Sequence, residues 1–575
     1  MVEKQIEIAV LSPRGETKVI PHFPAAKRLK TLAGKKIAVL KFTGNWGLTE
    51  ELLPLSQEIL KGKAKGIQFR EWSMAGGLKS REKRLSEIVD YADGVIVMLA
   101  FTGTSSARTA VEAVAIEKMG IPVAFAITRP FEANARFIAS REGLPDISIV
   151  TVPLESLPHP GEIAELKIPE KFADDVVQAL TQTPSIEREG PEKDVLVFGA
   201  PSYVATTRAM NAYFLRKGWS DGLPLVPPTR EAVDEMLDGT ELPPDHVIGL
   251  VEPGGGEATV EKIAVNAVMA GCLPAYMPVL IAAVEAIMDL NFDLREVQAT
   301  SCNMSPFLIV SGRKLIEELN INDSFSTIGP GWRANSTIGR AVRLIMTNIG
   351  HTWPGVNDMK TLGSPFRSIP LMAEKESAYQ GAWEPLRVAE GFPQDQATVS
   401  VMPAMSWQAD IVQPEPPTAG MIIDYIARQG KVKHDRLAAN WGMDNLVLLC
   451  ASTFDCIRRE GYTRKSFQQA LVDAIQIPVS DFLHGRKLED LVAFGRLPDW
   501  LVERCKAGPD KLVPILAGPE SIKLCVSGGA GPYGVTYTST FGYGAARFVT
   551  KPVSLPPNWD RLLEAVEECK SPLIE

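Results

Sequence analysis

Residues Gly94 to Ala100 read Gly-Val-Ile-Val-Met-Leu-Ala, and the turn Phe-Thr-Gly-Thr-Ser-Ser follows directly at 101–106. An unbroken apolar run of this length is typical of a strand that is buried on both faces, as strands are in a parallel sheet. Similar apolar runs lie at 36–40, 123–128 and 147–152. Segments with helical spacing lie between the runs, at 48–61, 80–91, 105–119 and 131–143. This alternation predicts a Rossmann-like, doubly wound α/β domain over residues 1–185.

The rest of the chain is expected to form a larger α/β region in two parts. At roughly 150 residues per domain, the 575 residues are enough for three or four domain-sized units. A polar, Pro/Glu-rich stretch at 181–194 predicts a linker, and Pro-Glu-Pro-Pro at 414–417 predicts another break. We therefore expect a second α/β region over 195–413, with Gly-rich and Arg/Asn loops, and a C-terminal α/β portion over 414–575 packed on it. Helices are expected at 258–270, 277–289, 335–347, 420–428, 466–474 and 560–569, and a Gly-rich strand pair around 527–531.

Composition and charge exclude several classes of protein. With 45% hydrophobic and 22% charged residues, the chain is not disordered, collagen-like or a coiled coil. A net charge of −9 gives no support for a nucleic-acid or membrane partner. Seven cysteines without a CxxC pair, and an N-terminus without signal-peptide order, favour a cytoplasmic protein. As is common for cytosolic enzymes, we expect a homo-oligomer.

The turn after Ala100 is the first candidate site. Hydroxyl side chains and free amides at a helix start can hold a carboxylate or a phosphate, so Thr102, Gly103, Thr104 and Ser105 are candidate substrate-binding residues. The alternative is plain helix capping, which is the commonest use of such residues.

A second candidate is the Gly-rich turn at 254–256, which we expect to open the helix that follows. Backbone amides of Gly255 and Gly256 would face a ligand there, unless the glycines serve a flexible turn. No P-loop or dinucleotide fingerprint is present.

Reactive and charged side chains supply the other candidates. Cys302 lies in a polar turn, whereas Cys272 at a helix end is expected to be buried. His351 lies in a loop and is a candidate general base. Arg333 would clamp a carboxylate beside Asn335, which can also cap the next helix.

Neither a metal ion nor a cofactor is expected. The six histidines are isolated, without an HxH or HExxH pattern or a Cys/His cluster. No Gly-x-Ser-x-Gly elbow suggests a serine triad.

Several of these segments resemble the UGSC-type (seleno)proteins and, more distantly, the selenoprotein B component of glycine, betaine and D-proline reductases. The matching segments are 94–97, 102–105, 117–122, 128–131, 222–229, 266–272, 333–340, 383–386 and 527–531. The resemblance implies selenocysteine or cysteine at the position of Thr102 and a second cysteine at that of Ser105. A hydroxyl cannot cycle through a disulfide or selenylsulfide, so we do not expect thiol redox chemistry at this loop.

These observations favour an enzyme that acts on a small anionic metabolite in an inter-domain cleft. The reaction would be lyase-like or hydrolase-like cleavage or formation of a carbon–heteroatom bond. Thr102 would orient the substrate, Arg333 would neutralise it, and Cys302 or His351 would be the reactive group. Two alternatives stay open: a non-catalytic subunit that partners an active Sec- or Cys-containing relative, and a reductase that uses Cys272 or Cys302.

Overall fold

The structure is a computed structural model of the chain. It describes residues 5–17, 22–41, 48–74, 78–100, 102–156, 159, 161–183, 193–364, 368–405, 409–413, 416–432, 441–493, 497–540 and 546–570. Most of the linker predicted at 181–194, together with Pro414 and Glu415 of the second predicted break, lies outside the described residues.

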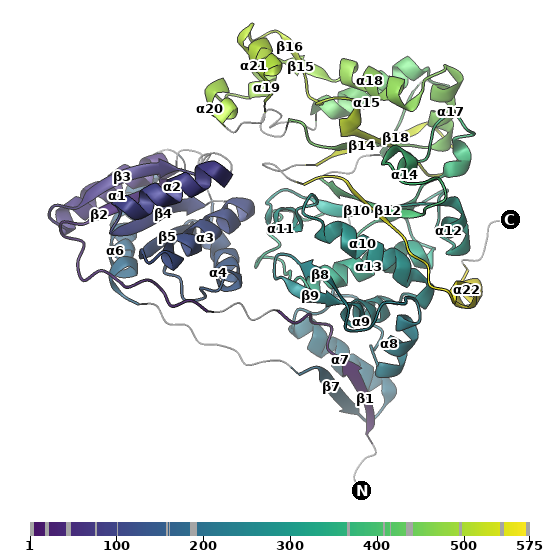
Figure 1. Cartoon of the computed structure of the whole chain (residues 1–575), viewed down its shortest axis with the longest axis horizontal. Coiled ribbons are helices and arrows are strands. Elements are labelled where there is room, and N and C mark those ends of the chain that lie inside the picture. The colour runs from purple at the N-terminus through teal and green to yellow at the C-terminus, as the bar shows by residue number, and fades with distance from the viewer. Residues whose placement is uncertain are drawn as a thin grey trace.

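Five parallel strands form the N-terminal sheet, in the order β3-β2-β4-β5-β6 (Figure 1). Their bounds are β2 Lys36–Lys41, β3 Gln68–Ser73, β4 Gly94–Ala100, β5 Val123–Thr128 and β6 Ile149–Val152. Every residue of β4 and β5 is buried, as their apolar runs predicted. The Rossmann-like fold class is therefore confirmed.

Helices cover both faces of this sheet. Their bounds are α1 Leu48–Lys63, α2 Leu78–Tyr91, α3 Gly103–Lys118, η1 Arg129–Phe131, α4 Glu132–Arg141, α5 Glu162–Glu165 and α6 Ile168–Thr181. One apolar cluster joins the sheet to α1 and α6, and a second joins its other face to α2, α3 and α4. Strand β3 was not predicted, because its sequence Gln-Phe-Arg-Glu-Trp-Ser is that of an exposed edge strand and lacks an apolar run.

The strand order identifies one edge of this domain as the place for a ligand. Strand β2 has β3 on one side and β4 on the other, so the connections after β2 and β4 lead away in opposite directions. In open α/β sheets, ligands bind outside the carboxyl ends of the strands at such a switch point. Thr102 follows the carboxyl end of β4 by two residues.

The second region is built from three sheets and a group of helices around one large core. Its strands are β1 Ile6–Leu11, β7 Val195–Ala200, β8 Val247–Val251, β9 Gly256–Thr259, β10 Ser305–Ser311, β11 Leu371–Ala373, β12 Thr398–Ala404 and β19 Val549–Pro552. Its helices are α7 Tyr203–Arg216, α8 Arg230–Leu237, α9 Val260–Ala270, η2 Pro274–Tyr276, α10 Met277–Met288, α11 Leu294–Ala299, α12 Arg313–Glu318, α13 Arg333–Asn348, η3 Glu376–Ala378, α14 Leu386–Ala389 and α22 Trp559–Glu568.

Both ends of the chain join this second region, which the linear order of the sequence does not indicate. Strand β1 pairs with β7, and β19 pairs with β12 in the sheet β11-β10-β12-β19. The helix α22 contributes Trp559 to the same core. Residues 5–17 therefore pack with the second region rather than with the N-terminal sheet that follows them in sequence.

The C-terminal region contains the sheet β13-β18-β14-β17 and the short pair β15-β16. Its strands are β13 Ala409–Ile411, β14 Asn445–Leu449, β15 Gln476–Pro478, β16 Leu512–Pro514, β17 Ile522–Val526 and β18 Gly534–Ser539. Its helices are α15 Ala419–Val432, α17 Ala451–Arg459, α18 Arg464–Ala474, α19 Val479–Leu483, α20 Leu488–Ala493, α21 Asp499–Lys506 and η4 Pro519–Ser521. The strand pair predicted around 527–531 is wrong, because β14 lies between β17 and β18.

The two four-stranded sheets pack on each other through a small apolar cluster that includes Phe307 of β10, Met402 of β12 and Leu446 of β14. Figure 1 shows them stacked on the right, with the N-terminal domain on the left and α11 facing it. Within the described residues, no helix combines the length and the apolar character that crossing a membrane requires.

Candidate functional site

Helix α3 begins with a capping box formed by Thr102 and Ser105. The Ser105 amide donates to Thr102 Oγ1 at 3.2 Å, and the Thr102 amide donates to Ser105 Oγ at 3.0 Å. The two hydroxyl oxygens are 2.8 Å apart, and Ser105 is buried. Within the described residues, neither hydroxyl bonds to a histidine or a carboxylate, so no general base activates them.

Gly103 brings the start of α3 into direct contact with the second region. A Cβ atom at Gly103 would lie 1.5 Å from the carbonyl oxygen of Ala299 and 2.6 Å from the Cβ of Met359. The Gly103 amide donates to the Ser301 hydroxyl at 3.2 Å. Gly103 is therefore required by a close backbone approach.

We call this contact the seam: α3 and α4 of the N-terminal domain against residues 252–256, 293–305 and 351–362 of the second region. An ion pair of 2.7 Å between Arg108 and Glu296 also crosses it. The loop that carries Cys302 lies in the seam next to the Thr102 turn, because Ser301 bonds to Gly103. Cys302 itself is half-buried. The structure thus brings together two of the segments that the sequence singled out.

Two cations that sequence reasoning missed lie beside this loop. Lys360 Nζ donates to Gln298 Oε1 at 3.1 Å and to Asp358 Oδ1 at 2.9 Å, and its side chain is 3% exposed. Arg343 of α13 is half-buried, and its Nη2 lies 3.4 Å from the Ser305 hydroxyl. The adjacent Asp221 is held by Arg340 at 2.7 Å and 3.0 Å, so Asp358 is the carboxylate left to balance both cations.

Burial lowers the pKa of both Lys360 and Arg343, which favours their neutral forms. It lowers the pKa of Lys360, and Arg343 lowers that pKa further, while Asp358 opposes the shift. Burial also lowers the pKa of Arg343, against the field of Asp358 and Asp221. A lysine whose pKa is lowered next to a second cation is suited to proton transfer.

The Gly-rich turn and His351 form a separate cluster. Gly255 packs under the guanidinium of Arg141, and a Cβ at Gly254 would lie 2.6 Å from the His351 ring. The amides of Gly254 and Gly255 donate to the carbonyls of Gly350 and Val251, at 2.9 Å and 2.7 Å. They are therefore not free to face a ligand.

The helix predicted after the Gly254–Thr259 segment is α9, and it begins at Val260 with Thr259 as its N-cap. The glycines themselves do not form the helix start, because β9 Gly256–Thr259 lies between them and α9. The glycines instead allow the turn to pack closely against Arg141, His351 and the carbonyl of Ile349.

Arg333 and Asn335 contact residues of the second region rather than the seam. Arg333 Nε donates to the Gly271 carbonyl at 3.0 Å, and its Nη1 lies 3.0 Å from Cys569 Sγ at the end of α22. Asn335 is buried, and its side chain bonds to the backbone of Asn322, Thr327 and Leu371. The contacts of both residues are those of structural groups.

Cys272 lies in the core of the second region, as expected. Burial raises its pKa to about 12, which outweighs the opposing effects of Thr337, Arg333 and Arg340. A thiolate is therefore disfavoured there at neutral pH. Across the described residues, no group of three or more His, Cys, Asp or Glu side chains is arranged to hold a metal ion.

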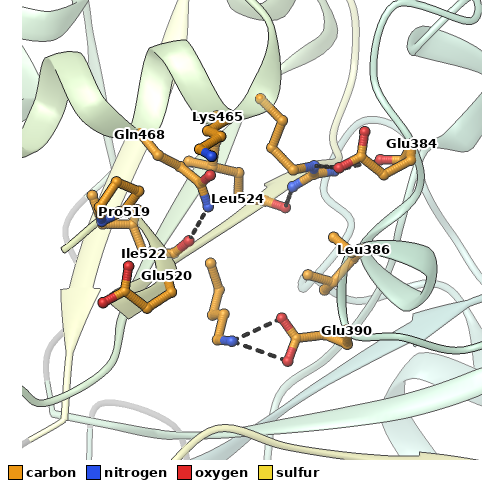
Figure 2. A pocket seen from close by; sticks show the side chains of 12 residues that line it. Glu384, Leu386, Glu390, Lys465, Gln468, Pro519, Glu520, Ile522 and Leu524 are labelled. Carbon is orange, nitrogen blue, oxygen red and sulfur yellow. Dashed lines mark hydrogen bonds and ion pairs between the residues drawn. The ribbon is translucent and has the colours of Figure 1, made fainter.

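A polar cavity of about 480 Å³ lies at the start of α18 in the C-terminal region (Figure 2). Arg464 donates to the carbonyls of Leu524 and Glu384, at 2.7 Å and 2.6 Å. Lys523 and Glu390 form an ion pair of 2.8 Å across the cavity wall. Because these charges already pair with one another, we do not assign this cavity as the candidate site.

Sequence signals for the missed cations were weak. Arg343 belongs to an Arg-containing helix whose charges would ordinarily be solvated, and Lys360 follows a Trp-Pro-Gly loop without a recognisable motif. Their importance follows from a tertiary contact, because Arg343 and Lys360 are more than 200 positions away from Thr102 in the sequence.

Comparisons with known proteins find a family match for the N-terminal part of the chain. Residues 9–182 match the model of the UGSC family. No curated protein matches the chain. A short-chain flavodoxin associated with a PDU bacterial microcompartment aligns with 12% identity and a TM-score of 0.19, over 26% of this chain and 99% of its own. That TM-score is too low to support an argument, and the more distant similarity to selenoprotein B stays a prediction.

The matched segment contains all five strands of the parallel sheet and the Thr102–Ser105 box. The N-terminal domain, residues 9–182, is therefore similar to the UGSC family, and the match covers less than half of the chain.

Proposed function

We propose that this protein is an enzyme that binds a small anionic metabolite at the seam and makes or breaks a carbon–heteroatom bond. One observation carries the proposal: Arg343 and Lys360 are enclosed beside the 298–305 loop with Asp358 as their shared carboxylate. Unbalanced buried charge is costly, and an anionic ligand would offset that cost.

The position of these cations supports a ligand site rather than a structural ion pair. Arg343 keeps part of its surface accessible although burial is the largest influence on its pKa. Through Gln298 and Ser301, these cations lie near the start of α3, which follows the carboxyl end of β4, where a sheet with this strand order is expected to bind ligands.

The candidate roles differ from those expected from the sequence. Lys360 is the candidate for proton transfer, because its lowered pKa brings it closer to neutrality. Cys302 is a half-buried thiol in the adjoining loop. Thr102 and Ser105 are not candidate nucleophiles, because their hydroxyls bond to each other and lack a base.

Calorimetric titration of the full chain with inorganic phosphate and with small mono- and dicarboxylates tests the binding step. Replacing Arg343 by Gln, or Lys360 by Met, is expected to weaken binding by about ten-fold or more, equivalent to about 1.4 kcal/mol. Arg333→Ala is the matched control, because Arg333 contacts Gly271 and Cys569 instead. Equal anion affinities in the wild type, Arg343→Gln and Lys360→Met would refute the proposal.

A non-catalytic subunit is the second candidate, and the capping box favours it. Thr102 and Ser105 satisfy each other where the resemblance implies a redox pair, so the loop has the contacts of a helix cap. Stable co-purification with a Sec- or Cys-containing relative, together with ligand binding but no turnover, would support this candidate over the enzyme.

A further inference from the structure

Arg141, the last residue of α4, extends from the N-terminal domain onto the Gly-rich turn of the second region. A Cβ at Gly255 would lie 1.6 Å from Arg141 Nη2, and Gly255 has a φ of +64°. The left-handed backbone favours glycine at this position. The guanidinium of Arg141 therefore packs directly on the backbone of the opposite side of the seam.

Arg141 has no counter-charge there. In the part of the chain that the structure describes, it forms no hydrogen bond or ion pair, and its Nε is buried without a partner. The nearby carboxylates of Glu142 and Glu252 are both paired with Arg295, at 3.7 Å and 3.0 Å. A half-buried guanidinium without an acceptor is unfavourable unless a ligand supplies one.

His351 lies on the other side of the same turn. Its ring packs against Gly254 and Gly256, its Nε2 lies 3.1 Å from the Thr17 hydroxyl, and its Nδ1 is buried without a partner. Burial, followed by the charges of Arg14 and Arg141, lowers the pKa of His351 to about 3, and a backbone hydrogen bond with Gly15 opposes the shift.

We propose that Arg141, His351 and Thr17 form an anion site across the seam, distinct from the proposed substrate site beside Arg343 and Lys360. The ligand class is a small oxyanion, a phosphate or a carboxylate, which would accept hydrogen bonds from the guanidinium of Arg141. Because Arg141 belongs to the N-terminal domain and His351 to the second region, the bound anion would hold the two together.

Calorimetry on the full chain with inorganic phosphate and with acetate tests this site. Phosphate and acetate are each titrated into the Arg343→Gln protein. This substitution weakens binding at the proposed substrate site, so that the two sites are measured separately. Arg141→Gln in this background is expected to weaken binding by about ten-fold or more. Arg136→Gln is the matched control on the same helix, because Arg136 is paired with Glu132 at 2.8 Å. Binding of phosphate without acetate would identify the ligand as a phosphate, and binding of both would identify it as any small oxyanion.

Absence of binding in the Arg343→Gln background would overturn the proposed anion site while leaving the proposed function intact. Equal binding by the Arg141→Gln and Arg136→Gln proteins would also overturn it. If Arg343→Gln loses all anion binding and phosphate does not change the pKa of His351, the protein has one anion site, the proposed substrate site.

The titration of His351 gives a readout that a purely structural role of Arg141 would not produce. With histidine-selective labelling, and His351→Gln to assign the signal, phosphate is expected to raise the pKa of His351 in the wild type. Arg141→Gln is expected to raise that pKa without phosphate, because it removes a neighbouring positive charge. In the Arg141→Gln protein, adding phosphate should then leave the pKa of His351 unchanged. A His351 pKa that is the same with and without phosphate in the wild type would contradict the proposal.

Discussion

Helices α3 and α18 begin with the same capping box, Thr-x-x-Ser. In α3 the hydroxyls of Thr102 and Ser105 are 2.8 Å apart, and in α18 those of Thr463 and Ser466 are 3.1 Å apart. The reciprocal amide bonds are also equivalent in the two boxes, at 3.0–3.2 Å and 2.9–3.1 Å. The local chemistry of the two helix starts is therefore the same.

Their surroundings differ because of the residue after the threonine. Gly103 lets the start of α3 touch Ala299 and Ser301, in a seam that also holds Lys360. At the equivalent position α18 has Arg464, whose guanidinium donates to the carbonyls of Leu524 and Glu384. A capping box is thus not a site by itself, and what packs on it decides its use.

The largest expected effect is on the α18 side. Arg464→Met removes two hydrogen bonds from a buried guanidinium, and because bonds to charged groups contribute about 1.5–3 kcal/mol each, we expect a loss of about 3 kcal/mol in the free energy of unfolding. Denaturant unfolding followed by fluorescence measures it, with the exposed Lys465→Met as control. Anion binding at the seam should not change; if it is lost too, the two helix starts are not independent.

Gly103→Ala is expected to separate the seam. The added methyl group would overlap the Ala299 carbonyl, and overpacking of this kind costs about 1–3 kcal/mol. Thermal unfolding and anion titration of the variant should both show losses. Gly420→Ala at the start of α15 is the control, because the nearest atom to its added Cβ lies at 3.8 Å. Unchanged anion affinity in Gly103→Ala would contradict a site at the seam.

The two N-cap threonines sharpen the comparison. Thr102→Ala and Thr463→Ala should each lower stability by about 1 kcal/mol, since each removes one cap. Anion binding should weaken in Thr102→Ala alone, because Thr463 lies in the C-terminal region. Thr102→Ser and Thr463→Ser retain the hydroxyl and should restore the wild-type values. Equal anion affinity in both alanine variants would limit Thr102 to capping.

The smallest effect is expected when each box is converted to a cysteine pair. Thr102→Cys/Ser105→Cys and Thr463→Cys/Ser466→Cys should both oxidise to disulfides, because the replaced oxygens lie 2.8 Å and 3.1 Å apart. Stability should change by no more than about 1 kcal/mol, because the lost cap opposes the gain from closing a short loop. After oxidation and denaturation, thiol titration should find no more than the seven thiols of the wild type. Two additional thiols in the α3 variant would show that its positions cannot form a redox pair.

Much of the N-terminal domain was predictable because its strands are continuous apolar runs. Strands β4 and β5 have the predicted bounds, and α3 begins two residues before the predicted start. Strand β3 was missed because a polar edge strand carries no such pattern. The Thr102 turn was identified as a helix start, but the sequence could not distinguish it from the equivalent start of α18.

The order of apolar and polar residues along the chain determined the parallel sheet, its helices and their caps, because these depend on neighbours within a few residues. Only the tertiary structure decided which cap lies at a seam, since the contacts of Gly103 with Ala299 and of Lys360 with Gln298 join segments far apart in sequence. It also separated Arg333 from the Thr102 turn and placed Arg141 beside His351. Charge recognition depends on distance and burial in space, and neither quantity is encoded in a local pattern.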